Sequence, residues 1–281
     1  MTTRLVLAPV VVAALLAPGG RARPAPGAPG TRVSAGAVVT VVAAEYRFSL
    51  PASVAAGPTT FRLVNRGREV HHVTLIRLLD GKTLADLEAL LPKGPPLPAW
   101  AIAVGGPNAA NPGGTSEALV VLEPGRYAVL CFVPAPDGAP HAMKGMVQEL
   151  EVTAAEGKAA PEETPDIRMD LANYAFSAST PLTAGRHLLR VRNTDRQWHE
   201  LVLFRLAPGK TARDFVAWAE AMKTPPPGTF QGGVSPLAPG LENDVPLRLD
   251  RGRYVLVCFL EDATDGKPHF MHGMVQELQV D

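Results

Sequence analysis

The chain has 281 residues, enough for two domains of ordinary size, each with a core of its own. Its 27 lysines and arginines balance 27 acidic residues, which excludes the basic excess that is typical of nucleic-acid-binding proteins, so we expect no nucleic-acid partner. With 26 glycines and 28 prolines, the composition argues against a bundle of long helices and favours short strands joined by turns.

Residues 1–30 have the pattern of a secretory signal peptide followed by a disordered lead-in. Arg4 supplies a positive charge, and the apolar stretch LVLAPVVVAALLA at 5–17 is too short to span a bilayer. We therefore expect a periplasmic or extracellular protein with no stable membrane span after signal cleavage. The alternative is an uncleaved N-terminal anchor, because no clean A-x-A cleavage site is evident.

The rest of the chain contains an internal repeat. HAMKGMVQEL at 141–150 recurs as HFMHGMVQEL at 269–278. Two further matches are NRGREVHHVTLIRL (65–78) with NTDRQWHELVLFRL (193–206), and PGRYAVLCF (124–132) with RGRYVLVCF (251–259). Repetition of this length predicts two copies of one domain.

The boundaries of the two copies follow from the composition between them. AAEGKAAPEETP at 154–165 is rich in Ala, Glu and Pro and has nothing to bury, which is typical of a linker. We therefore predict a first domain at 38–153 and a second at 166–281.

Short runs rich in β-branched residues and bounded by Gly, Pro and Asn predict strands within each copy. In the first copy they lie at 38–43, 60–65, 72–78, 117–122, 126–132 and 145–152. Strands of this length and spacing are typical of a Greek-key β-sandwich. The predicted fold is therefore all-β, with two tandem sandwiches.

One helix is expected in each copy. Thr83-x-x-Asp86 and Thr211-x-x-Asp214 are N-cap signatures that precede apolar residues three and four apart. A long loop rich in glycine and proline follows each helix, at 102–114 and 230–240. Each sandwich is thus predicted to carry one inserted helix and one long Gly/Pro loop.

Four potential metal ligands recur in the same order in both copies. They are His71, Cys131, His141 and Met146 in the first copy and His199, Cys258, His269 and Met274 in the second. Two imidazoles, one thiolate and a weak axial thioether hold copper in trigonal geometry. This ligand set serves both oxidation states of copper, so the ion can change charge with little rearrangement. The sequence therefore predicts one type 1 copper site per copy and two copper ions per chain.

Other assignments of these residues remain open from the sequence. Met143 and Met271 also follow the histidines and are alternative axial ligands. A disulfide between Cys131 and Cys258 is the natural alternative in a secreted protein, but equivalent positions in two separate cores should not meet. We therefore favour copper ligation by both cysteines.

Three histidines lie outside the repeated ligand set: His72, His187 and His272. His72 aligns with Glu200 and His187 with Thr59, so neither is repeated in the other copy. We interpret His72 and His187 as ordinary surface histidines, and His272, which replaces Lys144, as a candidate minor modifier of the second site.

Three short patterns of each copy resemble the motifs of the cupredoxins, the blue copper proteins. They are N-x5-H at 65–71 and 193–199, G-x-Y-x3-C at 125–131 and 252–258, and H-x3-G-M at 141–146 and 269–274. The resemblance covers both copies and implies two cupredoxin-like domains. The loop between Cys and His departs from the small cupredoxins, which have a shorter one, but copper nitrite reductases have a loop of comparable length.

The resemblance also carries expectations about the surroundings of the site. It implies that Asn65 and Asn193 tie two ligand-bearing loops together by a hydrogen bond, although both asparagines also suit a turn. It further implies that the outer edges of His141 and His269 reach solvent through an apolar patch. A redox partner protein, whose identity the sequence does not give, would dock there.

The histidine count bears on whether the chain is an enzyme. Copper oxidases and nitrite reductases add histidine-bound copper centres, and this chain has 7 histidines and no H-x-H or H-C-H motif. The sequence therefore predicts that the chain is not an enzyme. The leading hypothesis is a secreted two-domain electron carrier. The alternatives are a copper-binding or storage module and an interaction domain whose metal is incidental.

Overall fold

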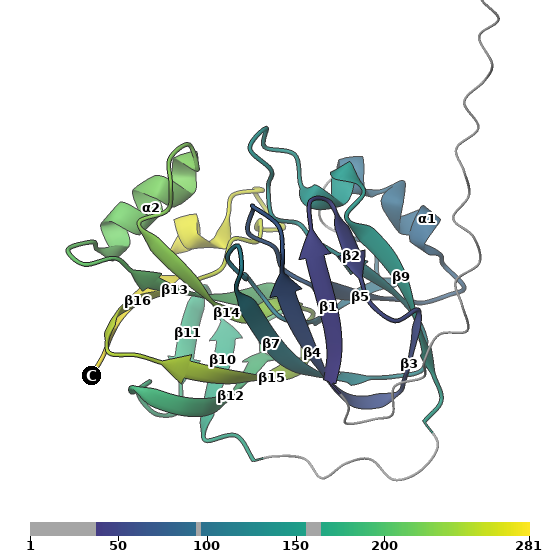
Figure 1. Ribbon diagram of the computed structural model, residues 1–281, viewed down its shortest axis with the longest axis horizontal. Helices are drawn as coiled ribbons and strands as arrows, with labels where there is room; N and C mark the ends of the chain where they lie inside the picture. Colours follow the sequence, from purple (N-terminus) through teal and green to yellow (C-terminus); the bar gives the residue numbers. More distant parts are fainter. Residues whose placement is uncertain (1–37, 94–96, 156–163) are drawn as a thin grey trace, which may run out of the picture. The chain divides into compact units, whose positions relative to one another are not determined.

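Figure 1 shows the computed structural model of the chain, which describes residues 38–93, 97–155 and 164–281. The predicted signal peptide and lead-in at 1–30 lie outside the described residues, as does most of the predicted linker at 154–165. No helix among the described residues is long and apolar enough to cross a membrane.

The first copy consists of strands with one short helix between them. Its strands are β1 (Val38–Ala44), β2 (Arg47–Ser49), β3 (Ser53–Ala55), β4 (Gly57–Asn65), β5 (Thr74–Leu78), β6 (Ala101–Gly105), β7 (Thr115–Leu122), β8 (Gly125–Leu130) and β9 (Val147–Thr153). Its helices are α1 (Leu84–Glu88) and the 3-10 turns η1 (Leu91–Lys93) and η2 (His141–Lys144). All six runs predicted as strands coincide with observed strands.

The second copy repeats this order of elements, except that β3 and η1 have no counterpart among the described residues. Its strands are β10 (Ile167–Ala172), β11 (Ala175–Ala178), β12 (Gly185–Asn193), β13 (His199–Leu206), β14 (Gly228–Leu237), β15 (Glu242–Leu249), β16 (Gly252–Val257) and β17 (Val275–Val280). Its helices are α2 (Ala212–Ala221) and the 3-10 turn η3 (His269–His272).

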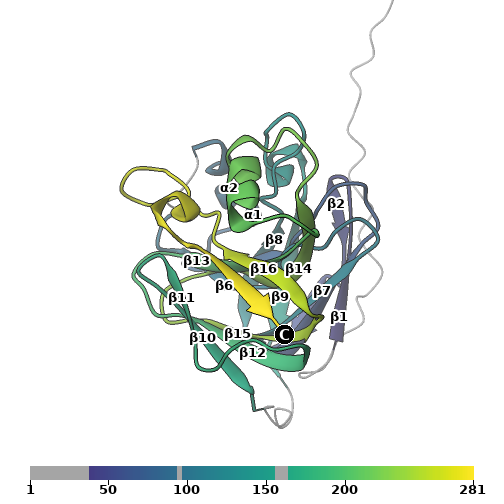
Figure 2. The same ribbon diagram turned by 90° about the vertical axis from the view of Figure 1, so that its left-hand side faces the viewer.

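Two sheets run through both copies. The strand order is β11-β10-β12-β15-β7-β4-β1-β2 in one sheet and β17-β16-β13-β14-β6-β5-β8-β9-β3 in the other. The copies join where β7 pairs with β15 and where β6 pairs with β14. Figure 2 shows the second copy with β13, β16 and β17 in one layer and β10, β12 and β15 in the other. The predicted all-β fold of two tandem sandwiches is confirmed.

The core of each copy lies between the two sheets. Along β1 every second residue is buried, so Val39 and Val41 face inward and pack with Phe61 and Leu63 of β4. This alternation is what a strand with one buried face requires. Cys131 and Met146 belong to the same buried cluster as these residues, and Cys258 and Met274 belong to the corresponding cluster of the second copy. The predicted ligands therefore lie at the ends of the strands that build each core.

The predicted N-caps are confirmed in both helices. The Thr83 side chain accepts a hydrogen bond from the Asp86 N–H while the Asp86 carboxylate accepts one from the Thr83 N–H, and Thr211 and Asp214 repeat this capping box. The first helix is shorter than its apolar pattern indicated. It ends at Glu88 and continues as a 3-10 turn, because Pro92 has no N–H and disfavours the α conformation in the residue before it.

Strands extend into the ranges expected to be long loops. β6 occupies the start of 102–114 and β14 most of 230–240. Backbone hydrogen bonds at Gly106 and Gly233 connect the two copies at this point. The Ser235 N–H donates to Gly106 O at 2.9 Å, and the Asn108 N–H donates to Gly233 O at 3.2 Å. Both strands also pair within their own copy, β6 with β5 and β14 with β13, so strand pairing outweighs the glycine and proline that marked these ranges as loops.

Candidate metal centres

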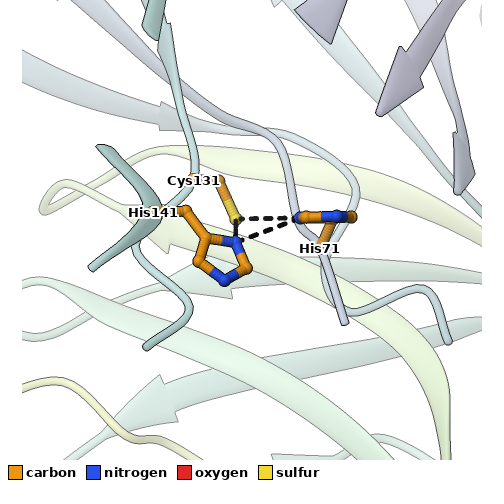
Figure 3. A group of neighbouring side chains, drawn as sticks. All are labelled: His71, Cys131 and His141. Atoms are coloured by element: carbon orange, nitrogen blue, oxygen red, sulfur yellow. Dashed lines mark hydrogen bonds between the residues drawn. The ribbon is translucent and has the colours of Figure 1, made fainter. Parts of the chain in front are cut away.

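Three potential ligands of the first copy converge on one point. His71 Nδ1 lies 3.1 Å from His141 Nδ1, and Cys131 Sγ lies 3.5 Å from His141 Nδ1 and 4.0 Å from His71 Nδ1 (Figure 3). All three side chains are 0% exposed. Donors this close, and all turned inward, form a preorganised three-ligand group.

The second copy builds the same group from its own residues. His199 Nδ1 lies 3.1 Å from His269 Nδ1, and Cys258 Sγ lies 3.4 Å from His269 Nδ1. These three side chains are also 0% exposed. The two copies therefore agree in donor atoms, separations and burial.

Backbone hydrogen bonds fix the positions of the three side chains in the first copy. His71 exchanges two backbone hydrogen bonds with Ala110, at 3.2 and 2.8 Å. Cys131 follows β8, and its N–H donates to Met146 O, while the Met146 N–H donates to His141 O. The second copy has the equivalent bonds from Cys258 to Met274 and from Met274 to His269. A framework of this kind holds the donors in place without needing a bound ligand.

Burial separates the two candidates for the axial position in each copy. Met146 and Met274 are 0% exposed and lie in the same buried clusters as the cysteines. Met143 and Met271 are 50% and 53% exposed. This supports Met146 and Met274 as the axial residues.

The donor sets fit a first-row metal ion that prefers sulfur and nitrogen. Bonds of about 2.0–2.3 Å from one ion to nitrogen and sulfur, about 100–120° apart, place such donors about 3.1–3.8 Å from one another. The observed separations lie close to this range. Burial raises the pKa of the Cys131 thiol to about 12, so a bound cation is what would convert it to the thiolate that copper takes. Burial also lowers the pKa of His71, which keeps the imidazole neutral, as ligation requires.

The cysteines are free and buried, so the alternative disulfide is not formed.

Asn65 is also buried, and its Nδ2 donates to Glu69 O at 2.7 Å and Ala110 O at 2.8 Å. Asn193 donates in the same way to Gln197 O and Leu237 O. Each asparagine thus ties the loop before the first histidine to a segment without a ligand, which differs from the link between two ligand-bearing loops implied by the resemblance.

The expectation that the loop histidines reach solvent through an apolar patch is wrong. His141 and His269 are 0% exposed, and their neighbours Ala142 and Phe270 are each 5% exposed. Tyrosine rings lie against the two histidines, Tyr46 at 4.9 Å from His141 and Tyr174 at 5.3 Å from His269 between ring centroids. These tyrosines come from the turns after β1 and β10, and no sequence pattern indicated that these turns contact the site.

Carboxylates face the outer nitrogens of the ligand histidines. Glu69 Oε2 lies 2.8 Å from His141 Nε2, and Asp195 Oδ2 lies 2.9 Å from His199 Nε2. Sequence reasoning missed these residues. The only signal was their position a few residues ahead of the first histidine of each motif, at a place where acidic residues are common on loops.

His72 is buried and not the surface residue expected from the sequence. Its Nε2 accepts the Phe132 N–H at 2.7 Å, and burial lowers its pKa to about 3. Glu200 occupies the equivalent position and accepts the Phe259 N–H at 3.0 Å. His72 and Glu200 thus have the same role, because each accepts a hydrogen bond from the backbone N–H of the residue after a ligand cysteine.

One asparagine connects these two side chains across the copies. Asn108 Nδ2 donates to Glu200 Oε2 at 3.0 Å, and the same side chain hydrogen-bonds to His72. Asn108 is 2% exposed. The backbones on either side of the two cysteines are therefore joined through one buried amide. Two more histidines lie outside the ligand set: His187 is partly buried and bonds to Asp166 and Thr183 O, and His272 Nε2 lies 3.1 Å from Asp265 Oδ1.

No protein-family model and no curated protein matches the chain. Among solved structures, auracyanin A, a "blue" copper protein from the green thermophilic photosynthetic bacterium Chloroflexus aurantiacus, is 23% identical, covering 41% of this chain and 99% of its own, with a TM-score of 0.30. Copper nitrite reductase from Nitrosomonas europaea is 14% identical, covering 89% of this chain and 94% of its own, with a TM-score of 0.25. Blue copper oxidase from the same organism is 13% identical, covering 89% and 86%, with a TM-score of 0.24.

The prediction that the chain is not an enzyme is contradicted by these matches. The solved structures that cover 89% of the chain include a nitrite reductase and an oxidase, which are enzymes. The histidine count assumed that a catalytic centre must be built from additional histidines of the same chain. That assumption was too narrow, because carboxylates also bind metals and a centre can be shared between chains.

At these identities and TM-scores, the strand order and the repeated ligand groups of the chain itself carry the assignment of the fold. Two sheets that each run through two copies, with parallel β1–β4 and β10–β12 pairs, build two sandwiches. Each sandwich brings its histidines and cysteine together at equivalent places. The chain therefore folds as two tandem cupredoxin-like sandwiches, and the His–Cys–His group in each of them supports copper binding.

Proposed function

We propose that the chain binds two copper ions, one in each copy, and transfers electrons one at a time to or from a redox partner protein. The ligands are His71, Cys131 and His141 with axial Met146, and the four equivalent residues of the second copy. The observation that carries this proposal is the same buried three-donor group in both copies, with Nδ1–Nδ1 separations of 3.1 Å in each.

Copper supplies a one-electron couple when it is bound in such a site. The chain's part is to hold the donors in a geometry that suits both oxidation states. The backbone bonds between Cys131, Met146 and His141 do this in the first copy, because they link three ligands to one another directly. A site that does not need to rearrange when the charge changes is suited to fast electron transfer.

The place of action is proposed to be outside the cytoplasm, periplasmic or extracellular. The support is the signal-like sequence at 1–30. Two buried free thiols in an oxidising compartment are protected from disulfide formation by their burial and by metal binding. Cleavage can be checked by determining the N-terminus of the protein exported from a host cell.

A redox titration separates electron transfer from copper storage. The copper-loaded chain is reduced stepwise without oxygen while its visible absorption and electron paramagnetic resonance are followed. We expect reversible bleaching with one electron per copper, and full recovery on reoxidation. Loss of copper on reduction, or a single irreversible step, would support a storage module instead.

Replacing Met146 by leucine is expected to leave copper bound in the first centre and to raise its reduction potential, because the thioether is the weakest ligand of a type 1 site. Met143→Leu is the matched control, since that side chain is 50% exposed. Spectroelectrochemistry of both variants decides between the two methionines. A raised potential in Met143→Leu with none in Met146→Leu would reverse the axial assignment.

A further inference from the structure

Every histidine of the two ligand groups has a carboxylate beside its outer nitrogen. The distances from Nε2 to the nearest carboxylate oxygen are 3.4 Å for His71 with Glu45, 2.8 Å for His141 with Glu69, 2.9 Å for His199 with Asp195 and 3.9 Å for His269 with Asp262. Three of the four are hydrogen-bonding distances. The fourth leaves His269 Nε2 buried without a hydrogen-bond partner among the described residues.

These carboxylates do not come from equivalent positions of the repeat. With the first copy aligned on the second at an offset of 128, Glu45 aligns with Asn173, Glu69 with Gln197 and Asp195 with Gly67. Asp262 lies in the loop between Cys258 and His269 and is equivalent to Ala135 of the first copy. The Asp262 N–H donates to Lys267 O, as the Ala135 N–H donates to Ala139 O. Descent from one ancestral domain therefore does not explain why all four histidines have this neighbour.

The first histidine of each copy, His71 or His199, has a carboxylate beside its outer nitrogen, and the two copies supply it from positions that exclude each other. A Cβ at Gly67 would lie 2.2 Å from Glu45 Oε1 and 2.7 Å from His71 Nε2, so only glycine leaves room for Glu45. In the second copy the residue at this position is Asp195, whose own carboxylate takes that place. Each copy thus fills the same space with a carboxylate by a different route, which points to a requirement of the site rather than of the fold.

Other groups hold the carboxylates in position. Glu45 accepts the N–H of Glu69 at 2.9 Å, and Asp195 accepts the N–H of Asn173 at 2.8 Å. In each copy one tyrosine hydroxyl donates to the carboxylate beside the loop histidine. Tyr46 donates to Glu69, and Tyr174 donates to Asp262. The carboxylates are therefore fixed parts of the two sites and not mobile surface charges.

The charge of this arrangement favours one oxidation state of copper. With copper bound, the thiolate and the two carboxylates of each site would bring about three negative charges, which leaves about one with Cu(II) and about two with Cu(I). The extra negative charge of the reduced form would be buried beside the ligands, where it is weakly screened. A carboxylate that accepts the Nε2–H of a ligand imidazole also strengthens the donor at Nδ1.

We propose that four carboxylates are positioning residues that set each centre's preference for Cu(II) over Cu(I): Glu45, Glu69 and Asp195, which bind the outer nitrogens of their ligand histidines, and Asp262, which lies beside that of His269. This rests on the proposed function of the two sites. The distances rank the four residues. Glu69 and Asp195 lie closest to their histidines and have the largest effects, whereas Asp262 has a smaller one.

The test measures the reduction potential of each centre in the copper-loaded full chain. Glu69→Gln keeps the shape of the side chain and removes its charge, and it is measured in a Cys258→Ser background so that only the first centre contributes. The expected result is about a tenfold shift of the Cu(II)-to-Cu(I) affinity ratio toward Cu(I), which raises the potential by about 59 mV. Asp195→Asn in a Cys131→Ser background is the second variant, and Asp262→Asn in that background shifts the potential less.

Asp137→Asn is the matched control for loss of a negative charge near the first site. Asp137 lies in the loop between Cys131 and His141, but its carboxylate bonds to Lys144 instead of a ligand histidine. A potential of Glu69→Gln that matches the Asp137→Asn control, together with a potential of Asp195→Asn that matches its Cys131→Ser parent, in protein that retains copper, would overturn this inference and leave the proposed function standing. A parent protein that binds no copper would overturn the proposed function itself.

Discussion

Replacing Cys131 by serine is expected to abolish copper binding in the first centre and to leave the second intact. Cys131 Sγ would be the only anionic donor to an ion bound in the first group, because both imidazoles and the axial thioether are neutral. A serine hydroxyl does not become an alkoxide at neutral pH, so the ion would lose its strongest ligand. The measurement is copper per chain, together with the thiolate-to-copper absorption in the visible range.

Cys258→Ser is the equivalent variant of the second centre, and the intact centre of each single variant serves as the internal control. Each single variant should keep half of the copper and half of the absorption of the parent protein, and the double variant should keep neither. The metal-free variants should unfold at the same denaturant concentration as the metal-free parent, because serine is nearly isosteric with cysteine. Single variants that retain the full copper content would show that the cysteines are not ligands.

Gly233→Ala is expected to have the largest effect on the stability of the metal-free chain. Gly233 has a φ of +126° in β14, and a Cβ there would lie 1.9 Å from the backbone oxygen of Leu201 in β13. Both strands are held by pairing, so neither can withdraw. We expect the free energy of unfolding to fall by about 3 kcal/mol, which combines backbone strain with a steric clash.

Gly240→Ala separates the clash from the strain. Gly240 also has a positive φ, +81°, but no atom lies within 4 Å of a Cβ built there. Its replacement should cost about 1 kcal/mol, from the left-handed conformation alone. Urea unfolding of both variants, monitored by tryptophan fluorescence, gives the comparison. Equal losses at the two positions would mean that the close approach of β13 to β14 is absent in solution.

The residues of the candidate sites could be predicted from the sequence because they are repeated. His71, Cys131, His141 and Met146 each have an identical counterpart in the second copy, in the same order and context. Metal ligands tolerate little substitution, so a repeat that has diverged elsewhere still preserves them. The capping boxes could be predicted for a similar reason, since both partners lie within four residues of each other.

The surroundings of the sites could not be predicted because they depend on contacts between distant segments. Glu69 reaches His141 across 72 residues, and Asn108 reaches Glu200 across 92. The carboxylates also lie at non-equivalent positions of the two copies, so the alignment of the repeat concealed them. The burial of His72 was missed for the same reason. Its counterpart Glu200 also accepts the N–H of the residue after the cysteine, but with a different side chain, so the alignment showed no shared residue.

The copper content of the purified, copper-loaded parent chain tests the central claim most directly. The protein is loaded with Cu(II), freed of unbound metal, and analysed for copper per chain and for its visible and electron paramagnetic resonance spectra. Two coppers per chain with the intense visible band of a copper–thiolate bond are the predicted result. A chain that holds only trace copper, or copper without that band, would contradict the assignment of His71, Cys131, His141 and their counterparts as type 1 centres.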